Sequence, residues 1–273
     1  MAERSRRSDA ERAADGPAAL VTASVSGAVS LVTLNDPERR NPLSPALRDA
    51  LLDTLETALD DHAVRAVILA GAGGSFCAGG DIASMHALDR ESGRARIERS
   101  QALIRAIVTA RKPVIAAVEG VAAGAGLSLA AACDVVVAAS DARFMAAFGQ
   151  IGLMPDLGAL WSVPARTGLG AARRLLMLGD AVDGAEAVEI GLADRLAPPG
   201  ETLTVATAEA RRLADAPPLA LAAMKRVLAA HPQPLEAVLH AEAGHQAGLF
   251  ASDDLREGLA AFRDRRAPRF RGR

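Results

Sequence analysis

The sequence contains no tyrosine, and aromatic residues make up only 3% of its 273 residues. A nucleic-acid surface or a sugar cleft built on aromatic stacking is therefore not expected. An excess of charge of one sign is also missing. The formal net charge is −2, so no overall positive potential that would attract a polyanion is expected. Both absences argue against nucleic acid as a partner.

Cysteine is scarce, and Cys77 and Cys133 provide neither a disulfide framework nor metal-ligand spacing. The five histidines form no i,i+4 pair, so we expect no metal site. The absence of a disulfide framework fits a reducing, cytoplasmic location. Every long apolar run is interrupted before about 18 residues, which argues against a membrane-spanning helix. Residues 1–16 have mixed charge and no apolar signal core, and we expect a disordered N-terminal extension there.

Half of the residues are hydrophobic, enough to bury a sizeable core. Two β-rich runs, 19–26 and 28–34, predict a hairpin, and Ser44-Pro45 predicts the start of a helix. Uniformly apolar runs of the buried parallel type follow at 66–70, 114–118 and 135–139. The first two of them end in glycine-rich turns that lead toward helices. This order predicts an α/β fold with a parallel sheet, followed after Pro155 by mostly amphipathic helices.

The two glycine-rich turns are the candidate chemical features. The first is Ala78-Gly79-Gly80-Asp81 and the second contains Gly124-Ala125-Gly126. Such turns present unpaired N–H groups, and two of them side by side could stabilise an enolate or a tetrahedral oxyanion. The alternative is that the glycines only permit tight connections. Phosphate binding is disfavoured, because neither the Gly-Lys-Ser/Thr ending of a P-loop nor a complete G-x-G-x-x-G is present.

These turns and their surroundings resemble a known family. The segments that carry the resemblance are 39–43 (RRNPL), 75–82 (SFCAGGDI), 118–126 (VEGVAAGAG), 152–158 (GLMPDLG) and 256–262 (REGLAAF). In this order they resemble the crotonase (enoyl-CoA hydratase/isomerase) superfamily from about residue 19 to residue 270. The resemblance implies a spiral of ββα units in a core over residues 17–200. It also implies a helical C-terminal trimerisation region over residues 201–273.

The resemblance also implies site residues. The backbone N–H groups of Gly80 and Ala125 would form the oxyanion hole. The substrate would be an acyl-CoA thioester, so that coenzyme A is part of the substrate and no separate cofactor is needed. The expected partners are neither nucleic acid nor membrane but other copies of the chain, in a homotrimer or homohexamer. Further substrate-binding positions are Arg39, Arg40, Ala78, Asp81, Ile82 and Gly124.

The reaction depends on other positions. The two glutamates of the family's hydratases fall on Ser128 and Phe148 here, neither of which is a carboxylate. Asp156 stands where the family's isomerases often carry a working aspartate, and the region resembles epoxyphenylacetyl-CoA isomerase-like members. An isomerase with Asp156 as proton shuttle is therefore expected. Three alternatives stay open: Asp156 caps the following helix, the chain is a hydratase with an acid from elsewhere, or it is a catalytically silent acyl-CoA-binding trimer.

Three further features have structural interpretations. Cys77 is expected to be a small apolar filler rather than a nucleophile, because no histidine is positioned nearby. Glu119 is expected to be structural rather than a second acid. The arginine-rich end, from Arg263 to Arg273, is expected to be a solvated basic segment, with contact to coenzyme A phosphates as the functional alternative.

Overall fold

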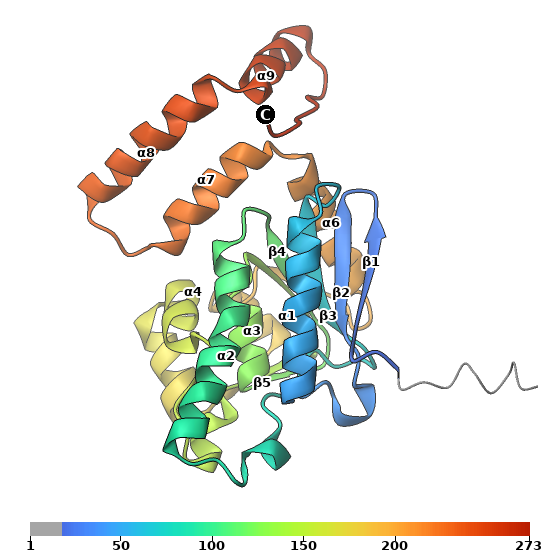
Figure 1. The fold of residues 1–273 in the computed structure, drawn as a ribbon, viewed down its shortest axis with the longest axis vertical. Helices are drawn as coiled ribbons and strands as arrows, with labels where there is room; N and C mark the ends of the chain where they lie inside the picture. Colours follow the sequence, from blue (N-terminus) through green and yellow to red (C-terminus); the bar gives the residue numbers. More distant parts are fainter. Residues whose placement is uncertain (1–17) are drawn as a thin grey trace, which may run out of the picture.

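The computed structural model describes residues 18–273 of the chain (Figure 1). Its main sheet has six strands in the order β1-β2-β3-β4-β6-β9. All neighbouring pairs are parallel except β1 and β2, which form the predicted antiparallel hairpin. The strands are β1 (Val21–Ser26), β2 (Val29–Leu34), β3 (Ala66–Gly71), β4 (Val114–Val118), β6 (Val135–Ala139) and β9 (Arg195–Ala197).

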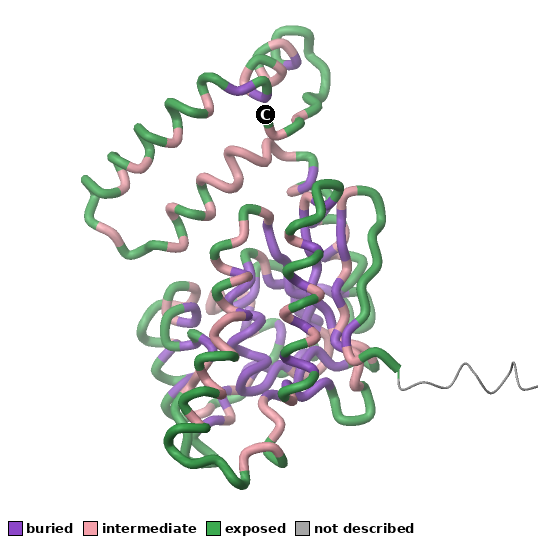
Figure 2. The backbone as a smooth tube through the Cα atoms, in the orientation of Figure 1, coloured by how far each residue is buried: buried purple, intermediate pink, exposed green. Residues whose placement is uncertain are grey.

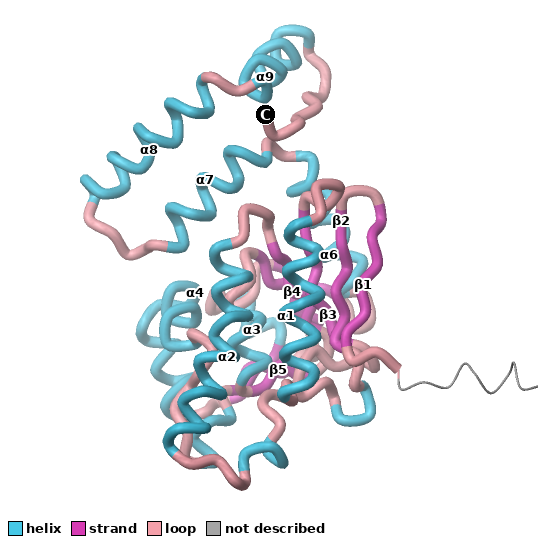
Figure 3. The backbone as a smooth tube through the Cα atoms, viewed as in Figure 1, coloured by secondary structure: helices cyan, strands magenta, loops and turns pink. Residues whose placement is uncertain are grey.

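The centre of this sheet is buried on both faces, which explains its uninterrupted apolar strands. In β3, Val67 and Leu69 join the larger core cluster, while Ala66 and Ile68 join a smaller cluster on the other face. Helices α1 (Pro45–Asp60) and α2 (Arg90–Thr109) lie on one side of the sheet (Figure 3). Helix α6 (Thr202–Asp215) covers the other side through alanines of the smaller cluster.

The helix starts follow from capping side chains. Ser44 accepts a hydrogen bond from the amide of Leu47 and Pro45 is the first residue of α1, as predicted. Helix α2 begins at Arg90. Asp89 and Ser92 form a reciprocal capping box there, in a first turn with no buried residue to mark it.

A second sheet of three short strands was not predicted. It consists of β5 (Val121–Ala123), β7 (Arg143–Met145) and β8 (Ala181–Asp183), in the order β5-β7-β8. Strand β5 directly precedes Gly124, where the second glycine-rich turn begins. It leads directly into α3 (Ala125–Ala131). The second sheet therefore positions the second glycine-rich turn.

The remaining helices before the C-terminal region are short or irregular. They are the 3₁₀ helices η1 (Pro37–Arg39), η2 (Ile82–Met85) and η3 (Ala147–Ile151), followed by α4 (Ala159–Arg173), the π-helical η4 (Arg174–Leu178) and α5 (Gly184–Glu189).

Three C-terminal helices extend away from the α/β body: α7 (Pro218–Ala229), α8 (Leu235–Phe250) and α9 (Asp253–Asp264) (Figure 1). Neither α7 nor α8 contains a buried residue, and the burial colouring shows this arm as mostly exposed or intermediate (Figure 2). Lys225 ties α7 to the body through Asp134, with 2.6 Å between Nζ and Oδ2. The helical residues from 201 onward thus comprise α6, which packs on the sheet, and an arm that begins at Pro218.

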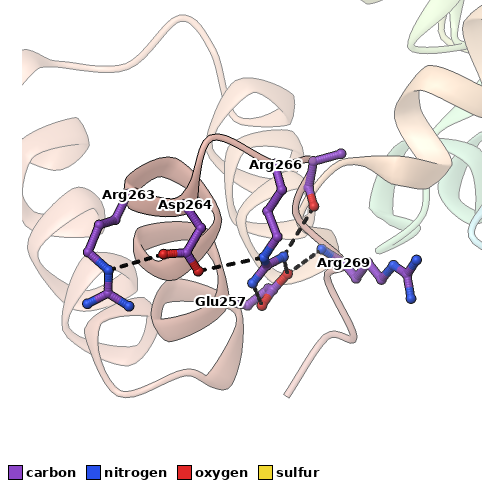
Figure 4. A network of polar contacts seen from close by, with 6 residues as sticks. Glu257, Arg263, Asp264, Arg266 and Arg269 are labelled. Atoms are coloured by element: carbon purple, nitrogen blue, oxygen red, sulfur yellow. Dashed lines mark hydrogen bonds and ion pairs between the residues drawn. The ribbon is translucent and has the colours of Figure 1, made fainter.

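Polar contacts hold the last helix to the tail of the chain (Figure 4). The Arg266 guanidinium donates to both carboxylate oxygens of Glu257, at 2.6 and 2.9 Å, and the Arg269 amide donates to the same carboxylate. These contacts hold the pKa of Glu257 down, at about 2. Arg266 is therefore paired within its own chain, while it and the other arginines of the tail are exposed, as expected.

Candidate active site

The two glycine-rich turns lie side by side and are joined by hydrogen bonds. The Cys77 amide donates to the carbonyl of Val121 at 2.9 Å, and the Ala123 amide donates to the carbonyl of Cys77 at 3.0 Å. A Cβ atom on Gly126 would stand 2.3 Å from the Cys77 carbonyl oxygen. Only glycine permits this approach, so the close packing of the two turns explains why the sequence has glycine at this position.

Two backbone amides are available at this junction. Gly80 follows Gly79, whose φ is +106°, and Ala125 is the first residue of α3 after Gly124, whose φ is +49°. Within the described part of the chain, the N–H groups of Gly80 and Ala125 donate to no protein atom. A Cβ atom built on Gly79 would lie 3.8 Å from the Ala125 nitrogen. The arrangement can offer two adjacent donors to one oxygen that gains negative charge.

The early segment lies against the first turn. The Arg40 carbonyl accepts from the Ala78 amide at 2.8 Å, and the Arg39 guanidinium pairs with the Asp81 carboxylate at 2.7 Å. Asn41 is fully buried and donates to the Ser75 carbonyl at 2.7 Å, which fixes the loop before the turn. The side chains of Arg40 and Ile82 are exposed, and that of Arg39 is exposed but paired with Asp81.

Asp156 lies in the turn between η3 and α4. The interpretation of Asp156 as a helix cap is wrong, because Gly158 is the N-cap of α4 and no side chain caps that helix. Instead, Asp156 precedes two residues with left-handed backbone, Leu157 at φ +50° and Gly158 at φ +71°. Leu157 is buried, and this packing holds an otherwise unfavourable conformation in place.

The Asp156 carboxyl group is poorly satisfied. Its Oδ1 atom is buried and has no hydrogen-bond partner among the described residues. Burial raises the pKa of Asp156, while the positive charge of Arg96 on α2 acts in the opposite direction. A carboxyl group with a raised pKa and a free oxygen is suited to accept and return a proton.

The two positions that correspond to the hydratase glutamates hold no carboxylate. The Ser128 side chain is fully buried, and its hydroxyl donates to the Gly124 carbonyl inside α3 at 3.3 Å. The Phe148 ring lies next to Gly124, 3.8 Å from where a Cβ atom would stand. An apolar ring therefore packs beside the second turn.

Sequence reasoning missed Ser84 and Arg96. The Arg96 guanidinium donates to the Ser84 hydroxyl at 2.9 Å, and that hydroxyl donates to the Asp81 carbonyl at 2.6 Å. An arginine in a polar helix gives no signal on its own. Its contact with a loop twelve residues away becomes visible only once the helix is placed.

Other candidates have structural roles. Cys77 is fully buried and burial raises its pKa to about 12, which agrees with a filler role. The Glu119 carboxylate accepts from the Gly200 amide and the Thr202 hydroxyl, both at 2.9 Å, and so holds the start of α6. His86 is exposed. In residues 18–273 no group of three His, Cys, Asp or Glu side chains is placed to hold a metal ion.

Comparison with known proteins shows the family of the chain. The family model described as enoyl-CoA hydratase/isomerase matches residues 24–273. The chain belongs to the enoyl-CoA hydratase/isomerase family. It is 38% identical over 250 residues to a Rhodobacter capsulatus protein named "Probable enoyl-CoA hydratase", covering 91% of this chain and 96% of the relative. It is 35% identical over 252 residues to the 1,2-epoxyphenylacetyl-CoA isomerase of Escherichia coli, covering 90% and 95%.

Solved structures of this family share the fold. The crystal structure of an enoyl-CoA hydratase from Polaromonas sp. JS666 superposes with a TM-score of 0.86 at 37% identity, covering 92% of this chain and 99% of that one. The expected α/β crotonase fold is therefore confirmed, and the chain is an acyl-CoA enzyme of the hydratase/isomerase family. None of the helices in residues 18–273 is long and apolar enough to cross a membrane.

Proposed function

We propose that this enzyme is an enoyl-CoA or ring-epoxide acyl-CoA isomerase in which Asp156 moves the proton. The observation that carries the proposal is the buried Oδ1 atom of Asp156, which has no hydrogen-bond partner among residues 18–273, while the expected hydratase acid positions hold Ser128 and Phe148. The amides of Gly80 and Ala125 hold the thioester oxygen as it becomes an enolate oxygen.

The reaction balances without added water. The Asp156 carboxylate takes a proton from one carbon of the acyl chain, and the electron pair of the broken C–H bond delocalises onto the thioester oxygen. The same carboxyl group then returns the proton to a different carbon, which moves the double bond. Each step needs one group that alternates between its protonated and ionised forms. A raised pKa lowers the free-energy difference between these two forms at neutral pH.

Enoyl-CoA hydratase is the second candidate, because the Rhodobacter capsulatus relative at 38% identity has that name. A hydratase must activate water, and this usually requires a second acid–base group near the double bond. Glu119 is the acidic residue next to the second turn, but both of its carboxylate oxygens are engaged with α6.

One isotope experiment separates the two reactions. The enzyme is incubated with 2-enoyl-CoA and 3-enoyl-CoA substrates in deuterium oxide or in ¹⁸O-labelled water, and the products are analysed by mass spectrometry. We expect double-bond migration without ¹⁸O, and deuterium at the α or γ carbon in those turnovers in which the proton on Asp156 exchanges with solvent before it is returned. Asp156→Asn should lose this exchange, whereas the matched control Glu119→Gln should keep it. Net addition of ¹⁸O by an active Asp156→Asn variant would refute the isomerase assignment.

A catalytically silent acyl-CoA-binding protein is tested by the same samples. That hypothesis requires thioester binding without any exchange at the α or γ carbon. Deuterium incorporation that depends on Asp156 would exclude it.

We further propose that the enzyme works as a homotrimer or a homohexamer. Large apolar side chains are exposed on the arm and near the end of the α4–η4 segment: Phe262 is 88% exposed, Met177 78% and Phe250 70%. Exposed apolar surface of this kind marks protein interfaces. Sedimentation of the purified enzyme should give three or six chains, and Phe262→Asp should lower that number; a monomeric wild-type enzyme would refute the proposal.

A further inference from the structure

The tail of the chain, residues 267–273, folds back along α9 (Figure 4). The Arg269 amide donates to the Glu257 carboxylate at 2.8 Å. The Asp254 carboxylate accepts from the Gly272 amide at 2.9 Å and from the amide of the residue before it at 2.6 Å. The tail therefore places backbone donors on two carboxylates that lie three residues apart, on one side of the helix.

The same tail contacts the α/β body and the start of the arm. The Phe270 carbonyl accepts from the Arg65 guanidinium at 2.9 Å, and Arg65 directly precedes β3 of the main sheet. A Cβ atom on Gly272 would stand 2.9 Å from Cγ of Pro218, the first residue of α7. One short segment therefore joins the body, the beginning of the arm and its last helix.

The arm is not packed tightly on the body. A cleft of about 1080 Å³ lies between them, with Glu56 and Asp60 of α1 on the body side and Leu219 of α7 and Arg271 of the tail on the arm side. Neither α7 nor α8 contains a buried residue, so apolar burial does little to hold these helices. The direction of the arm therefore depends on polar contacts, namely those of Lys225 in α7 and those of the tail.

Helix α9 has two different faces. Asp254 and Gly258 lie on the face that the tail covers: Asp254 is buried, and a Cβ atom on Gly258 would stand 3.5 Å from the Phe270 ring. Leu259 and Phe262, three residues apart, share another face, and both are strongly exposed. The grip of the tail on one face thus determines where the exposed apolar face points.

We propose that residues 267–273 are a clasp that locks the C-terminal arm to the α/β body and fixes the direction in which the Leu259–Phe262 face of α9 is presented. The consequence for assembly rests on the homotrimer or homohexamer proposed above. An arm that moved freely would lose that freedom when a second copy docks on it, and this loss weakens association. The clasp removes the cost in advance, because it orders the arm within each single chain.

Hydrogen–deuterium exchange of the full-length protein measures the clasp directly, through mass spectrometry of peptides from the tail and α9. Asp254→Asn removes the charged acceptor of two tail amides. It should speed exchange in the tail by about tenfold or more, the lower end of what the loss of a hydrogen bond to a charged group produces. Unchanged exchange of the tail in this variant would overturn the inference.

Asp253→Asn is the matched control, because it removes the same charge from the same turn of α9. The Asp253 carboxylate is exposed and pairs with the side chains of Arg256 and Arg273, not with tail amides. Exchange of the tail should stay near the wild-type rate, and an acceleration equal to that of Asp254→Asn would contradict the clasp. Thermal unfolding of each variant detects a general loss of structure. If Asp254→Asn does not fold, Gly272→Ala tests the same clasp through its contact with α7 and should speed exchange in the tail as well.

Assembly provides a second, separable readout, by sedimentation over a dilution series. Arg65→Gln breaks the contact between the tail and the body, and both it and Asp254→Asn should raise the concentration at which the oligomer forms by roughly tenfold. Arg111→Gln removes an exposed arginine from the same cleft and should leave that concentration unchanged. A loosened tail with unchanged assembly would refute the role of the clasp in presenting α9. If the wild-type enzyme is a monomer, the proposed assembly fails, and the exchange of the tail still decides whether the clasp exists.

Discussion

Replacing Gly79 by alanine tests whether the close contact between the two turns is needed for activity. The added Cβ atom would meet the Ala123 carbonyl oxygen at 2.8 Å and the Ala125 nitrogen at 3.8 Å, at a φ of +106° that residues with side chains rarely adopt. The first distance is shorter than a normal van der Waals contact. The first turn must therefore move away from the second, and the Gly80 and Ala125 amides must separate.

The size of the effect has two parts. The unfavourable backbone conformation costs about 1–3 kcal/mol of stability, and the clash with a packed carbonyl group costs about 1–3 kcal/mol more. Displacing one oxyanion donor should lower kcat by about 10²–10³-fold, as removal of such a donor does in other enzymes. If the Arg39–Asn41 segment binds the substrate as expected, KM should change much less, because this segment contacts the turn at Ala78.

Gly74→Ala is the matched control for this variant. Gly74 lies in the same loop at a φ of +71°, but a Cβ atom there would meet nothing within 4 Å. It should show the backbone cost without the clash and retain most of kcat. Both variants are compared by urea unfolding and by kcat and KM on an enoyl-CoA substrate. If Gly79→Ala lost no more kcat than Gly74→Ala, the two turns would not act as one oxyanion hole.

Three other predictions follow from charge and burial. Asp156→Asn should raise the thermal unfolding midpoint at pH 7 but have a smaller effect at pH 4. The pKa of Asp156 is raised in the folded state, so the stability that this group contributes is present in full below its unfolded pKa. That contribution is lost as pH rises through its folded pKa, and the variant cannot lose it. Equal stabilisation at both pH values would contradict this. Glu119→Gln should lower the free energy of unfolding by about 1–2 kcal/mol through a weakened start of α6, with kcat unchanged; a stable variant that loses kcat would instead make Glu119 a second acid. Cys77 and Cys133, whose pKa burial raises to about 12, should resist a thiol reagent at pH 8 until guanidinium unfolds the protein, and rapid labelling of the native enzyme would show that the turns open.

The sequence predicted the elements whose causes are local. Strands β4 and β6 run over the predicted residues, because a short, uninterrupted apolar run is typical of a parallel strand that is buried on both faces. Strands β5, β7 and β8 contain three residues each and pair across long stretches of chain. A run of three residues is too short to show a period, so nothing local could indicate the second sheet.

The site shows the same division. The glycines of both turns can be recognised from the sequence alone, because glycine is the residue type that tight turns need. The close contacts that require glycine are visible only in the structure. Glu119 finds its partners 81 and 83 residues further along the chain, and Arg96 finds Ser84 twelve residues back across a loop. Asp156 followed by Leu-Gly resembles a helix cap locally. The burial of Leu157, a tertiary effect, places two left-handed residues between the aspartate and the helix instead.

A carboxylate that moves a proton between two carbons has two opposing requirements. It must be ionised when the substrate arrives, and it must hold the proton long enough to deliver it elsewhere. Burial of Asp156 favours the protonated form and Arg96 favours the ionised form, so their opposition keeps both forms accessible. A hydratase meets a different demand, since its two acids share the work on one water molecule. With Ser128 hydrogen-bonded to the Gly124 carbonyl and Phe148 beside the second turn, the proposed isomerase reaction would depend on Asp156 as its single carboxylate.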